Sequence, residues 1–260
     1  MDSTQTIEWR GRRAPTIVGA GRSAAVHTAA AVAAPELSIL VPAKDEERTV
    51  QTVLRRVVEA CPSAEVIVVD DGSTDATSRE VQAIDSPRIR LLRHARNRGK
   101  GAAICTALAH ATGRFSIVQD ADLEYSPADI ESLLVLARAG APVVYGSRFL
   151  ARAWPRGMSP LNWIANRSLT LAANVLYRLD ITDEATCLKL FETELLRRLD
   201  VRAEGFEFCA EVTAKLGRLG VPVVEAPIGY VARSMQEGKK IRWTDGVRAA
   251  KTLLELRFAT

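Results

Sequence analysis

Three acidic side chains follow an apolar run in the segment IVQDADLE. Asp120, Asp122 and Glu124 recur at every second residue, so in an extended segment they would point to the same side. Crowded carboxylates repel one another unless a cation joins them, and Mg²⁺ or Mn²⁺ prefers such oxygens together with substrate phosphates. The spacing therefore predicts a divalent-metal site. The alternative is a solvated acidic loop before a helix that begins near Pro127.

A second acidic pair ends another apolar run, in VVDDGSTD. Asp70 and Asp71 can accept hydrogen bonds from the N–H groups of a base or from ribose hydroxyls, with Gly72 supplying a tight turn. The same residues also suit a turn and a helix cap, so a purely structural role is the alternative.

The string NRGKGAAI places Gly-Lys-Gly before a predicted helix, as a phosphate-binding loop would. It lacks the first glycine and the hydroxyl residue of that motif. We expect Asn97, Gly99 and Lys100 to form a loop that orders the nucleotide side of a site. A merely structural turn is the alternative.

Strand and helix patterns alternate through the part of the chain that must position these groups. Short β-branched runs predict strands over residues 37–42, 64–71, 88–94, 114–120 and 141–148, and helical spacing predicts helices over 46–61, 73–84, 99–112 and 126–140. This alternation predicts an α/β fold with a Rossmann-like, mostly parallel sheet flanked by helices. Ligands of such sheets bind at the carboxyl ends of the strands, where both acidic groups fall.

The two ends of the chain have different patterns. Residues 1–34 show no consistent period, and we interpret them as a flexible leader. The leader contains a G-x-G-x-x-A string, but the alanine-rich segment after it does not fit a dinucleotide-binding unit. Residues 35–260 are predicted to form one domain, in which helices over 160–179, 193–199, 207–220 and 243–258 and a strand over 221–230 build a second lobe on the same sheet.

The composition is that of a soluble globular protein. Hydrophobic residues make up 47% of the chain and charged residues 25%, with a net charge of +4 and a pI near 9.0. A mild positive charge suits an anionic small molecule or an acidic membrane surface, and no nucleic-acid-binding motif is present. Four cysteines without a CxxC pair predict neither a zinc site nor a disulfide framework. With no apolar stretch long enough to span a membrane, we expect a cytoplasmic protein.

Four strings in fixed order resemble the nucleotide-binding half of family 2 glycosyltransferases, which have the type A glycosyltransferase fold. The strings are LSILVPAKDEE, VIVVDDGSTDAT, RNRGKGAAI and VQDADLEYSP. In the second half, YGSRF, NRSLTLAANVLY, TDEATCLKLF, GFEFCAEVTAKL and PIGYVARSMQEGKKIRWTDG resemble polyprenyl-phosphate sugar transferases of the dolichol-phosphate mannose synthase type. The resemblance extends from about Leu37 to Phe258.

The resemblance implies a nucleotide-sugar half, residues 35–148, and an acceptor half, residues 149–260. It implies nucleoside contacts from Pro42, Ala43, Glu46, Asp70 and Asp71. It also implies that Asp122 and Glu124 hold Mg²⁺ or Mn²⁺ against the donor diphosphate, and that Asp120 contacts the ribose or the metal. Lys44-Asp45 stands where the family more often has Tyr-Asn, and Glu124 where it often has glutamine.

The chemistry of sugar transfer agrees with those roles. Breaking the bond from the anomeric carbon to a nucleoside diphosphate leaves negative charge on the β-phosphate, which a divalent ion stabilises. We expect further anion contacts from Arg148, Arg167 and Lys189, and an arginine fork suits phosphate in a way that lysine does not.

The acceptor decides whether a base is needed. A phosphate monoester is already anionic near pH 7 and needs only to be positioned, for which we expect Arg148, Arg167, Arg233, Lys239 and Lys240. A hydroxyl acceptor would have to lose its proton to a carboxylate, and Glu211, near the start of a helix, is the candidate. The alternative for Glu211 is an ordinary acid on a helix surface.

The closing helix places Trp243, Val247, Ala250 and Leu254 along one side. We expect this side to pack against the sheet, as in most amphipathic helices of globular domains. The alternative is that Trp243, Leu253 and Phe258 rest on a membrane surface that carries a lipid acceptor.

These features together predict a metal-dependent, inverting glycosyltransferase. It would move a hexose from GDP-mannose or UDP-glucose to a polyprenyl phosphate at the cytosolic membrane face. Two alternatives stay open: the same donor chemistry on a soluble hydroxyl acceptor such as a metabolite or glycan, and a non-catalytic protein that binds sugar nucleotides.

Overall fold

A computed structural model describes residues 34–233 and 243–259 of the chain. Most of the predicted leader, with its G-x-G-x-x-A string, therefore lies outside the described residues. The same holds for Lys239 and Lys240, which the sequence analysis assigned to the acceptor.

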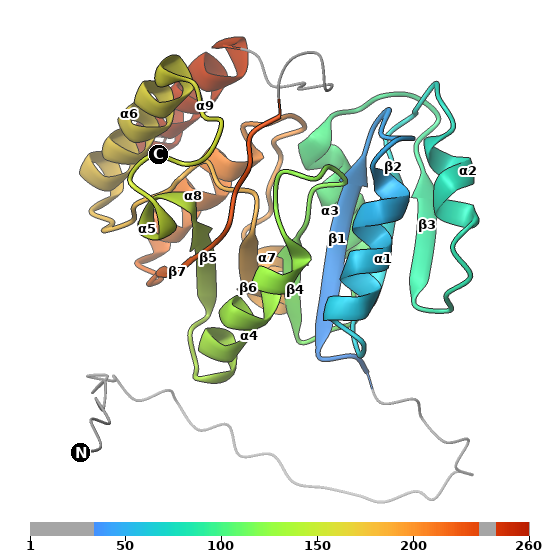
Figure 1. The fold of residues 1–260 in the computed structure, drawn as a ribbon. Helices are drawn as coiled ribbons and strands as arrows, with labels where there is room; N and C mark the ends of the chain where they lie inside the picture. Colours follow the sequence, from blue (N-terminus) through green and yellow to red (C-terminus); the bar gives the residue numbers. More distant parts are fainter. Residues whose placement is uncertain (1–33, 234–242, 260) are drawn as a thin grey trace, which may run out of the picture. The chain divides into compact units, whose positions relative to one another are not determined.

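Seven strands form one sheet in the described part of the chain (Figure 1). They are β1 (Leu37–Ala43), β2 (Glu65–Asp70), β3 (Ile89–Arg93), β4 (Phe115–Val118), β5 (Val143–Ser147), β6 (Lys189–Glu192) and β7 (Val224–Pro227). The order across the sheet is β3-β2-β1-β4-β6-β5-β7, and every pairing is parallel except the two that β6 makes. The predicted α/β fold with a mostly parallel sheet is confirmed.

The sequence analysis did not predict β6. It runs antiparallel between β4 and β5, with Phe115 opposite Glu192 and Val143 opposite Phe191. The run KLFE has four residues and begins with a lysine, so its hydrophobic period carries little signal. Its direction follows from the chain path, because the chain leaves β5 at the carboxyl edge of the sheet, forms helices at that edge and re-enters from there (Figure 1).

Helices on both faces bury the first half of the sheet. They are α1 (Val50–Ala60), α2 (Thr77–Gln82), α3 (Lys100–His110) and α4 (Ile130–Arg138), with a 3₁₀ turn, η1 (Pro127–Asp129), before α4. In Figure 1, α1 and α4 lie in front of the sheet and α3 lies behind it. Since both faces are covered, β1, β2 and β4 are almost entirely buried, which explains their continuous apolar sequences.

The second half adds five helices to the described chain. They are α5 (Arg148–Ala151), α6 (Pro160–Tyr177), α7 (Thr193–Arg198), α8 (Phe208–Leu219) and α9 (Trp243–Phe258). α6 and α9 pack together against α8, at the upper left of Figure 1. Ala173, Tyr177, Ala210, Ala214 and Leu253 form a small second core between them. No helix in the described residues is long and apolar enough to cross a bilayer.

The packing of α9 differs from the expectation. Trp243 is 78% exposed and Val247 57% exposed, although both were expected to pack against the sheet. The buried side chains are Ala249 and Leu253. The physical reason is that α9 packs on α6 and α8 instead of on the sheet, and the narrow strip of Ala249 and Leu253 makes this contact.

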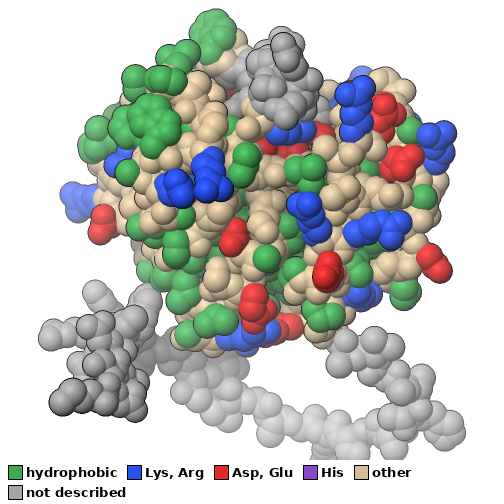
Figure 2. Space-filling view, in the orientation of Figure 1, with side chains coloured by type: hydrophobic (Ala, Val, Ile, Leu, Met, Phe, Trp, Pro, Cys, Tyr) green, Lys and Arg blue, Asp and Glu red, His purple; other side chains and the backbone are tan. Residues whose placement is uncertain are grey.

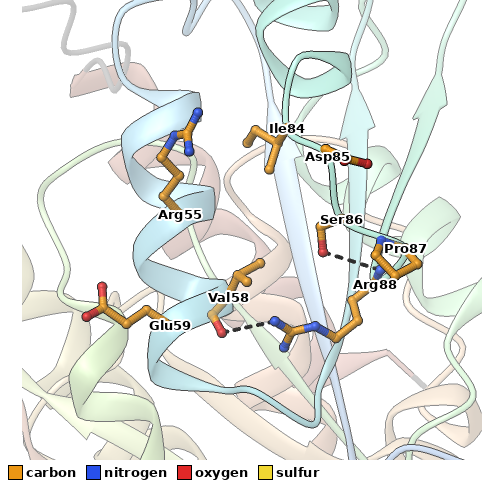
Figure 3. Close-up of a pocket in the computed structure, with 8 residues that line it drawn as sticks. All are labelled: Arg55, Val58, Glu59, Ile84, Asp85, Ser86, Pro87 and Arg88. Carbon is orange, nitrogen blue, oxygen red and sulfur yellow. Dashed lines mark hydrogen bonds between the residues drawn. The ribbon is translucent and has the colours of Figure 1, made fainter.

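A surface hollow lies between α1 and the segment that leads into β3 (Figure 3). The guanidinium of Arg88 reaches across toward α1 and donates hydrogen bonds to the carbonyl oxygens of Val58 and Cys61. These bonds satisfy carbonyls at the end of α1, which has no later helical N–H groups to pair with them. The hollow lies where β3 begins, at the opposite edge of the sheet from the acidic strand ends, and Arg88 has a structural role there.

The loop before α3 brings Lys100 to the carboxyl edge of the sheet. The Asn97 side chain accepts the backbone N–H of Gly99 at 3.0 Å, and α3 begins at Lys100. Gly99 has φ +103°, and a Cβ at this position would lie 2.3 Å from the carbonyl oxygen of Glu204. Only glycine fits there.

We predict that Gly99→Ala destabilises the protein by at least about 2 kcal/mol more than Gly140→Ala. Gly140 has a similar φ of +105°, and no atom lies within 4 Å of the position that an added methyl group would take, so its substitution costs only backbone strain of about 1 kcal/mol. Gly99→Ala adds an overpacking cost to the same strain. Urea unfolding of the two variants measures the difference, and equal costs would show that the contact with Glu204 relaxes freely.

Candidate active site

The acidic groups gather at one point on the carboxyl edge of the sheet. From β1 the chain crosses to β2 on one side, whereas β4 lies on the other side. The gap between the ends of β1 and β4 is therefore a topological switch point, where α/β sheets bind their ligands. Pro42 and Ala43 end β1 at this edge, Asp70 pairs with Ala43 at the end of β2, and Asp120 follows β4.

The acidic segment after β4 bends instead of continuing the strand. Residues 121–124 form a bend, so the carboxylates do not keep the two-residue repeat of an extended chain. Asp120 lies 2.6 Å from the ammonium of Lys100, whereas Asp122 lies 2.7 Å from the guanidinium of Arg233. Each of these two carboxylates thus has its own cationic partner.

The predicted three-carboxylate metal site is not assembled as a cage. No three His, Cys, Asp or Glu side chains within residues 34–233 and 243–259 converge on one cation position. Glu124 accepts hydrogen bonds from the hydroxyl of Tyr230 at 3.1 Å and from the backbone N–H of Arg233 at 2.8 Å, which holds it at the segment after β7.

Asp120 and Asp122 nevertheless fit a divalent cation that is shared with a substrate. Mg²⁺ in phosphate-handling sites is commonly held by one or two carboxylates, with phosphate oxygens and waters completing the shell. The negative charge of Asp120 is among the influences that raise the pKa of Asp122, so the two carboxylates repel each other. Two carboxylates at a ligand-binding edge supply hard oxygen ligands of the kind that such a cation prefers.

Arg233 joins the acidic groups from two parts of the chain. Its guanidinium lies 3.1 Å from Glu46 and 2.7 Å from Asp122, and its side chain is 13% exposed. The hydroxyl of Thr49 lies 2.7 Å from the Glu46 carboxylate and 2.9 Å from the carbonyl of Ala121. The segment after β1, the bend after β4 and the segment after β7 therefore meet at one cluster.

Burial and neighbouring charges shift the pKa values of Asp122 and Arg233 in this cluster. Burial, followed by the charge of Asp120, raises the pKa of Asp122 to about 7, although Arg233 opposes the shift. Burial acts against the charge on Arg233, but Asp122 and Glu46 outweigh it and hold the pKa of Arg233 above its usual range. Asp122 therefore exchanges its proton near neutral pH, where a proton and a metal ion compete for the same oxygens.

Asp70 and Asp71 shape the loops at the neighbouring strand ends. Both are buried. Asp70 accepts the backbone N–H of Ser73 at 2.7 Å, and Asp71 accepts those of Arg98 and Gly99 at 2.8 and 2.7 Å. Both residues therefore have a structural role, which the sequence analysis gave as the alternative to ligand binding. Their contact with a nucleoside stays a prediction.

His94 supports Asp71 and was not identified from the sequence. Its Nδ1 lies 2.7 Å from the Asp71 carboxylate, and its Nε2 lies 2.9 Å from the hydroxyl of Thr106 on α3. These contacts fix the Asp71 carboxylate between the end of β3 and α3. The sequence feature that could have identified His94 is its position. It is the last residue of a predicted strand, directly before the glycine-containing loop.

Arg148 is used inside the protein, contrary to the expected anion contact. Its guanidinium makes two 2.7 Å hydrogen bonds to the Asp183 carboxylate and stacks 5.1 Å from the centre of the Tyr230 ring. It is 5% exposed. Because Asp183 occupies the guanidinium in a bidentate pair, Arg148 positions Tyr230, and through it Glu124, from within the fold.

Lys189 and Arg167 also lie outside the acidic cluster. Lys189 is 1% exposed. Its ammonium donates to the Glu184 carbonyl at 2.7 Å and lies 3.3 Å from the centre of the Tyr145 ring, and burial lowers the pKa of Lys189. The Arg167 side chain is on α6, where it donates to the carbonyl of Thr182 at 3.1 Å. Neither cation contacts the carboxylates at the switch point.

Glu211 is fully engaged near the start of α8. Its carboxylate accepts the backbone N–H groups of Arg202 and Ala203 at 3.0 and 2.6 Å, and it lies 2.6 Å from the ammonium of Lys215. The residue is buried, so it is not the surface acid that was the alternative. It caps the loop before α8, and this role accounts for its position without a base function.

Metal-free protein is expected to lose stability as pH rises toward 7 because of Asp122. Its pKa is about 7 in the folded chain and ordinary when unfolded, so between about pH 4 and 7 the folded state holds a proton that the unfolded state has released. The loss is at most about 1.4 kcal/mol per pH unit. Urea unfolding in chelator across this range should therefore show that Asp122→Asn gains stability relative to wild type as pH rises. If the free energies of unfolding of the two proteins changed in parallel with pH, that result would contradict the raised pKa of Asp122.

Removing the charge of Asp183 is expected to cost about 3–5 kcal/mol of stability, because it leaves the buried guanidinium of Arg148 without its counter-ion. The control is Glu255→Gln, which removes an exposed carboxylate that lies 3.5 Å from Lys251 and should change stability by less than about 1 kcal/mol. Chemical denaturation of Asp183→Asn and the control measures both. A small loss for Asp183→Asn would mean that the pair is solvated.

Comparison with known proteins identifies the family. Residues 38–200 match the profile described as Glycosyl transferase family 2. An undecaprenyl-phosphate mannosyltransferase of Micrococcus luteus is 27% identical over 212 residues, which are 77% of this chain and 85% of that protein. A polyprenol monophosphomannose synthase of Mycolicibacterium smegmatis is 26% identical over 210 residues, covering 77% of this chain and 79% of the relative.

A solved structure shows the same fold. Glucosyl-3-phosphoglycerate synthase of Mycobacterium tuberculosis, in complex with UDP, superimposes with a TM-score of 0.67 at 21% identity, covering 86% of this chain and 80% of that one. The sheet and its helices are thus the type A glycosyltransferase fold. The resemblance to dolichol-phosphate mannose synthase-like enzymes is likewise confirmed by the relatives. The chain belongs to glycosyl transferase family 2 and is a glycosyltransferase.

Proposed function

We propose that this enzyme is a metal-dependent, inverting hexosyltransferase that uses GDP-mannose or UDP-glucose and transfers the sugar to a polyprenyl phosphate at the cytosolic face of a membrane. The observation that carries the proposal is the cluster of Glu46, Asp122 and Arg233 at the switch point of the sheet, beside the Asp120–Lys100 pair. Relatives named as undecaprenyl-phosphate mannosyltransferase and polyprenol monophosphomannose synthase support the lipid phosphate acceptor.

Asp120 and Asp122 are the residues that would hold Mg²⁺ or Mn²⁺ in this site. When bound, the cation would stabilise the negative charge that develops on the departing diphosphate. Lys100 and Arg233 now pair with the same two carboxylates. They are placed to contact diphosphate oxygens once a donor is bound, and the planar guanidinium of Arg233 can do so in a bidentate manner.

The nucleoside is assigned to the edge formed by β1 and β2. Pro42 and Ala43 end β1 there, and Asp71 holds the loop that contains Arg98 and Gly99 against it. A rigid rim of this kind lets backbone groups approach the base and the ribose closely, while the hydrogen bonds inside the loop fix its shape before the donor arrives.

A phosphate acceptor suits the described site better than a hydroxyl acceptor. A phosphate monoester carries its nucleophilic charge at pH 7, so the protein has to position it and need not deprotonate it. Glu211, the base expected for a hydroxyl acceptor, is bonded to the loop before α8. Arg233 remains at the cluster as a cation for the acceptor phosphate or the donor.

Asp122→Asn is expected to lower the rate of sugar transfer by at least about 100-fold, because it removes a charged oxygen ligand from the predicted metal site. Transfer of radiolabelled hexose from GDP-mannose and from UDP-glucose, with and without Mn²⁺, measures the effect. Glu59→Gln, at an exposed carboxylate on α1, is the control and should keep wild-type activity. Full metal-dependent transfer by Asp122→Asn would overturn the mechanism.

The same assay separates the acceptors. Wild-type enzyme is offered a short-chain polyprenyl phosphate that dissolves in water and, in parallel, a panel of soluble hydroxyl compounds. Transfer only to the hydroxyl compounds would reject the proposed acceptor while leaving the donor chemistry in place. Donor binding without transfer to any acceptor would instead support a non-catalytic sugar-nucleotide-binding protein.

A further inference from the structure

Asp71 follows β2 at the edge to which the nucleoside is assigned. Its backbone N–H donates to the Ala43 carbonyl at 2.8 Å, which places it beside the end of β1. The residue is 3% exposed. A carboxylate with so small an opening can offer a ligand very few hydrogen bonds, so the acceptor sites that remain on it decide what it recognises.

Three N–H donors already point at this carboxylate. Its Oδ1 accepts from Nδ1 of His94 at 2.7 Å and from the Arg98 backbone at 2.8 Å, and its Oδ2 accepts from the Gly99 backbone at 2.7 Å. A carboxylate has about four lone-pair sites, divided equally between its oxygens. Oδ1 is therefore filled, and Oδ2 has one acceptor site left.

His94 is held so that it keeps Oδ1 filled. Because a carboxylate cannot donate, the hydrogen bond to Asp71 requires a proton on Nδ1 of His94, and the Thr106 hydroxyl lies 2.9 Å from the other ring nitrogen. The backbone N–H of His94 donates to the Asp70 carbonyl at 2.9 Å. With both ring nitrogens and the backbone engaged, the buried ring keeps its place beside Asp71.

The other two acids assigned to the nucleoside do not add an acceptor at this point. Asp70 is fully buried, with its Oδ1 bonded to the Ser73 backbone N–H at 2.7 Å and its Oδ2 facing Arg93. Glu46 lies 3.1 Å from the guanidinium of Arg233, at the cluster beside β4. Of these three acids, Asp71 is thus the one that can face a base, and it does so with one site.

Uracil and guanine differ in the number of donors that they present. Uracil has a single N–H, at N3, between two carbonyl oxygens, whereas guanine presents two adjacent donors, at N1 and on the amino group. One acceptor site satisfies uracil and leaves a guanine donor unpaired, which costs affinity. The segment after β3 suits the uracil carbonyls, since residues 91–112 contain three arginines, one lysine and no Asp or Glu.

Surface charge does not make the same distinction. Figure 2 shows acidic and basic side chains mixed over the region where Figure 1 places α1, α2 and β3. Both nucleotides carry the same diphosphate, so a field of mixed sign gives no preference between them. The discrimination has to come from hydrogen bonds to the edge of the base.

We propose that Asp71, with its Oδ1 filled by His94 and the Arg98 backbone, accepts the N3–H of uracil, and that the donor is therefore a uridine diphosphate sugar. Asp71 is the residue that determines specificity, and His94 is a positioning residue. This inference rests on the proposed function, because it takes the nucleoside to lie at the edge of β1 and β2. It goes further by choosing between the two donor classes.

The test is titration calorimetry of the full chain with UDP, GDP and CDP in the presence of Mn²⁺. UDP is expected to bind at least about tenfold more tightly than GDP, which leaves a donor unpaired. CDP should also bind at least about tenfold more weakly than UDP, because cytosine has the size of uracil but turns a lone pair at N3 toward the Asp71 carboxylate. Binding of GDP or CDP as tightly as UDP would overturn the proposal.

His94→Ala tests the positioning role. It returns a lone pair to Oδ1 of Asp71, so the preference for UDP over GDP should fall by at least about fivefold. Thr106→Val, which releases the ring without removing it, should lower the preference in the same direction. His110→Ala is the matched control. It removes a histidine of α3 whose Nδ1 lies 2.9 Å from the Thr106 carbonyl, and it should keep the wild-type preference.

An equal loss of UDP and GDP binding in His94→Ala would show that the ring only supports the fold, and it would overturn the positioning role. The wild-type titrations test the choice of base without any variant, so that choice stays falsifiable even where His94→Ala does not fold.

Transfer assays separate this inference from the proposed function. UDP-glucose and GDP-glucose carry the same sugar, and kcat/KM is expected to be at least about tenfold higher for UDP-glucose. Metal-dependent transfer that prefers the guanosine donors would overturn the assignment of the base and leave the proposed function intact. Absence of both nucleotide binding and transfer would contradict the proposed function itself.

Discussion

Repulsion between buried carboxylates is the constraint around which this site is arranged. Glu46, Asp120, Asp122 and Glu124 meet at the carboxyl edge of the sheet, and Lys100 and Arg233 are the cations that contact them among the described residues. Burial strengthens every charge interaction in this cluster. Burial, followed by the charge of Asp120, raises the pKa of Asp122, and a divalent cation bound there would favour the charged carboxylate.

The same contacts hold distant parts of the chain together. Arg233 is 187 residues from Glu46 and 111 from Asp122 in sequence, so the cluster ties the segment after β7 to the ends of β1 and β4. Tyr230 and Glu124 repeat this connection. The first and second halves of the domain therefore share one site, as a transferase requires when its donor and acceptor must meet. The charges that connect these segments are also the ones to which the proposed chemistry is assigned.

The sequence predicted the sheet, most helices and the location of the acidic groups, because those features have local signals. Apolar runs ended by proline or aspartate indicate strand ends, and β1, β2 and β4 end within two residues of the predicted positions. β6 was missed because a four-residue strand has no usable period. The exposed side of α9 was predicted wrongly. Amphipathic spacing shows that one face of a helix is more apolar than the other, but the elements packed against the helix decide which face is buried.

The basic residues show most clearly what sequence cannot supply. Arg148, Lys189 and Arg233 looked alike as anion contacts, but their partners give them different roles. Asp183 holds Arg148 by two parallel hydrogen bonds in a fully buried pair, and Lys189 is enclosed against Tyr145.

Arg233 is instead shared between two carboxylates at 3.1 and 2.7 Å and keeps some exposure. A cation held by several partners at the edge of a site can exchange one of them for a phosphate at little cost, whereas separating a buried bidentate pair leaves a charge uncompensated. The proposal that Arg233 and not Arg148 meets the substrate therefore rests on the carboxylates around each of them, and these come from parts of the chain that only the fold brings together.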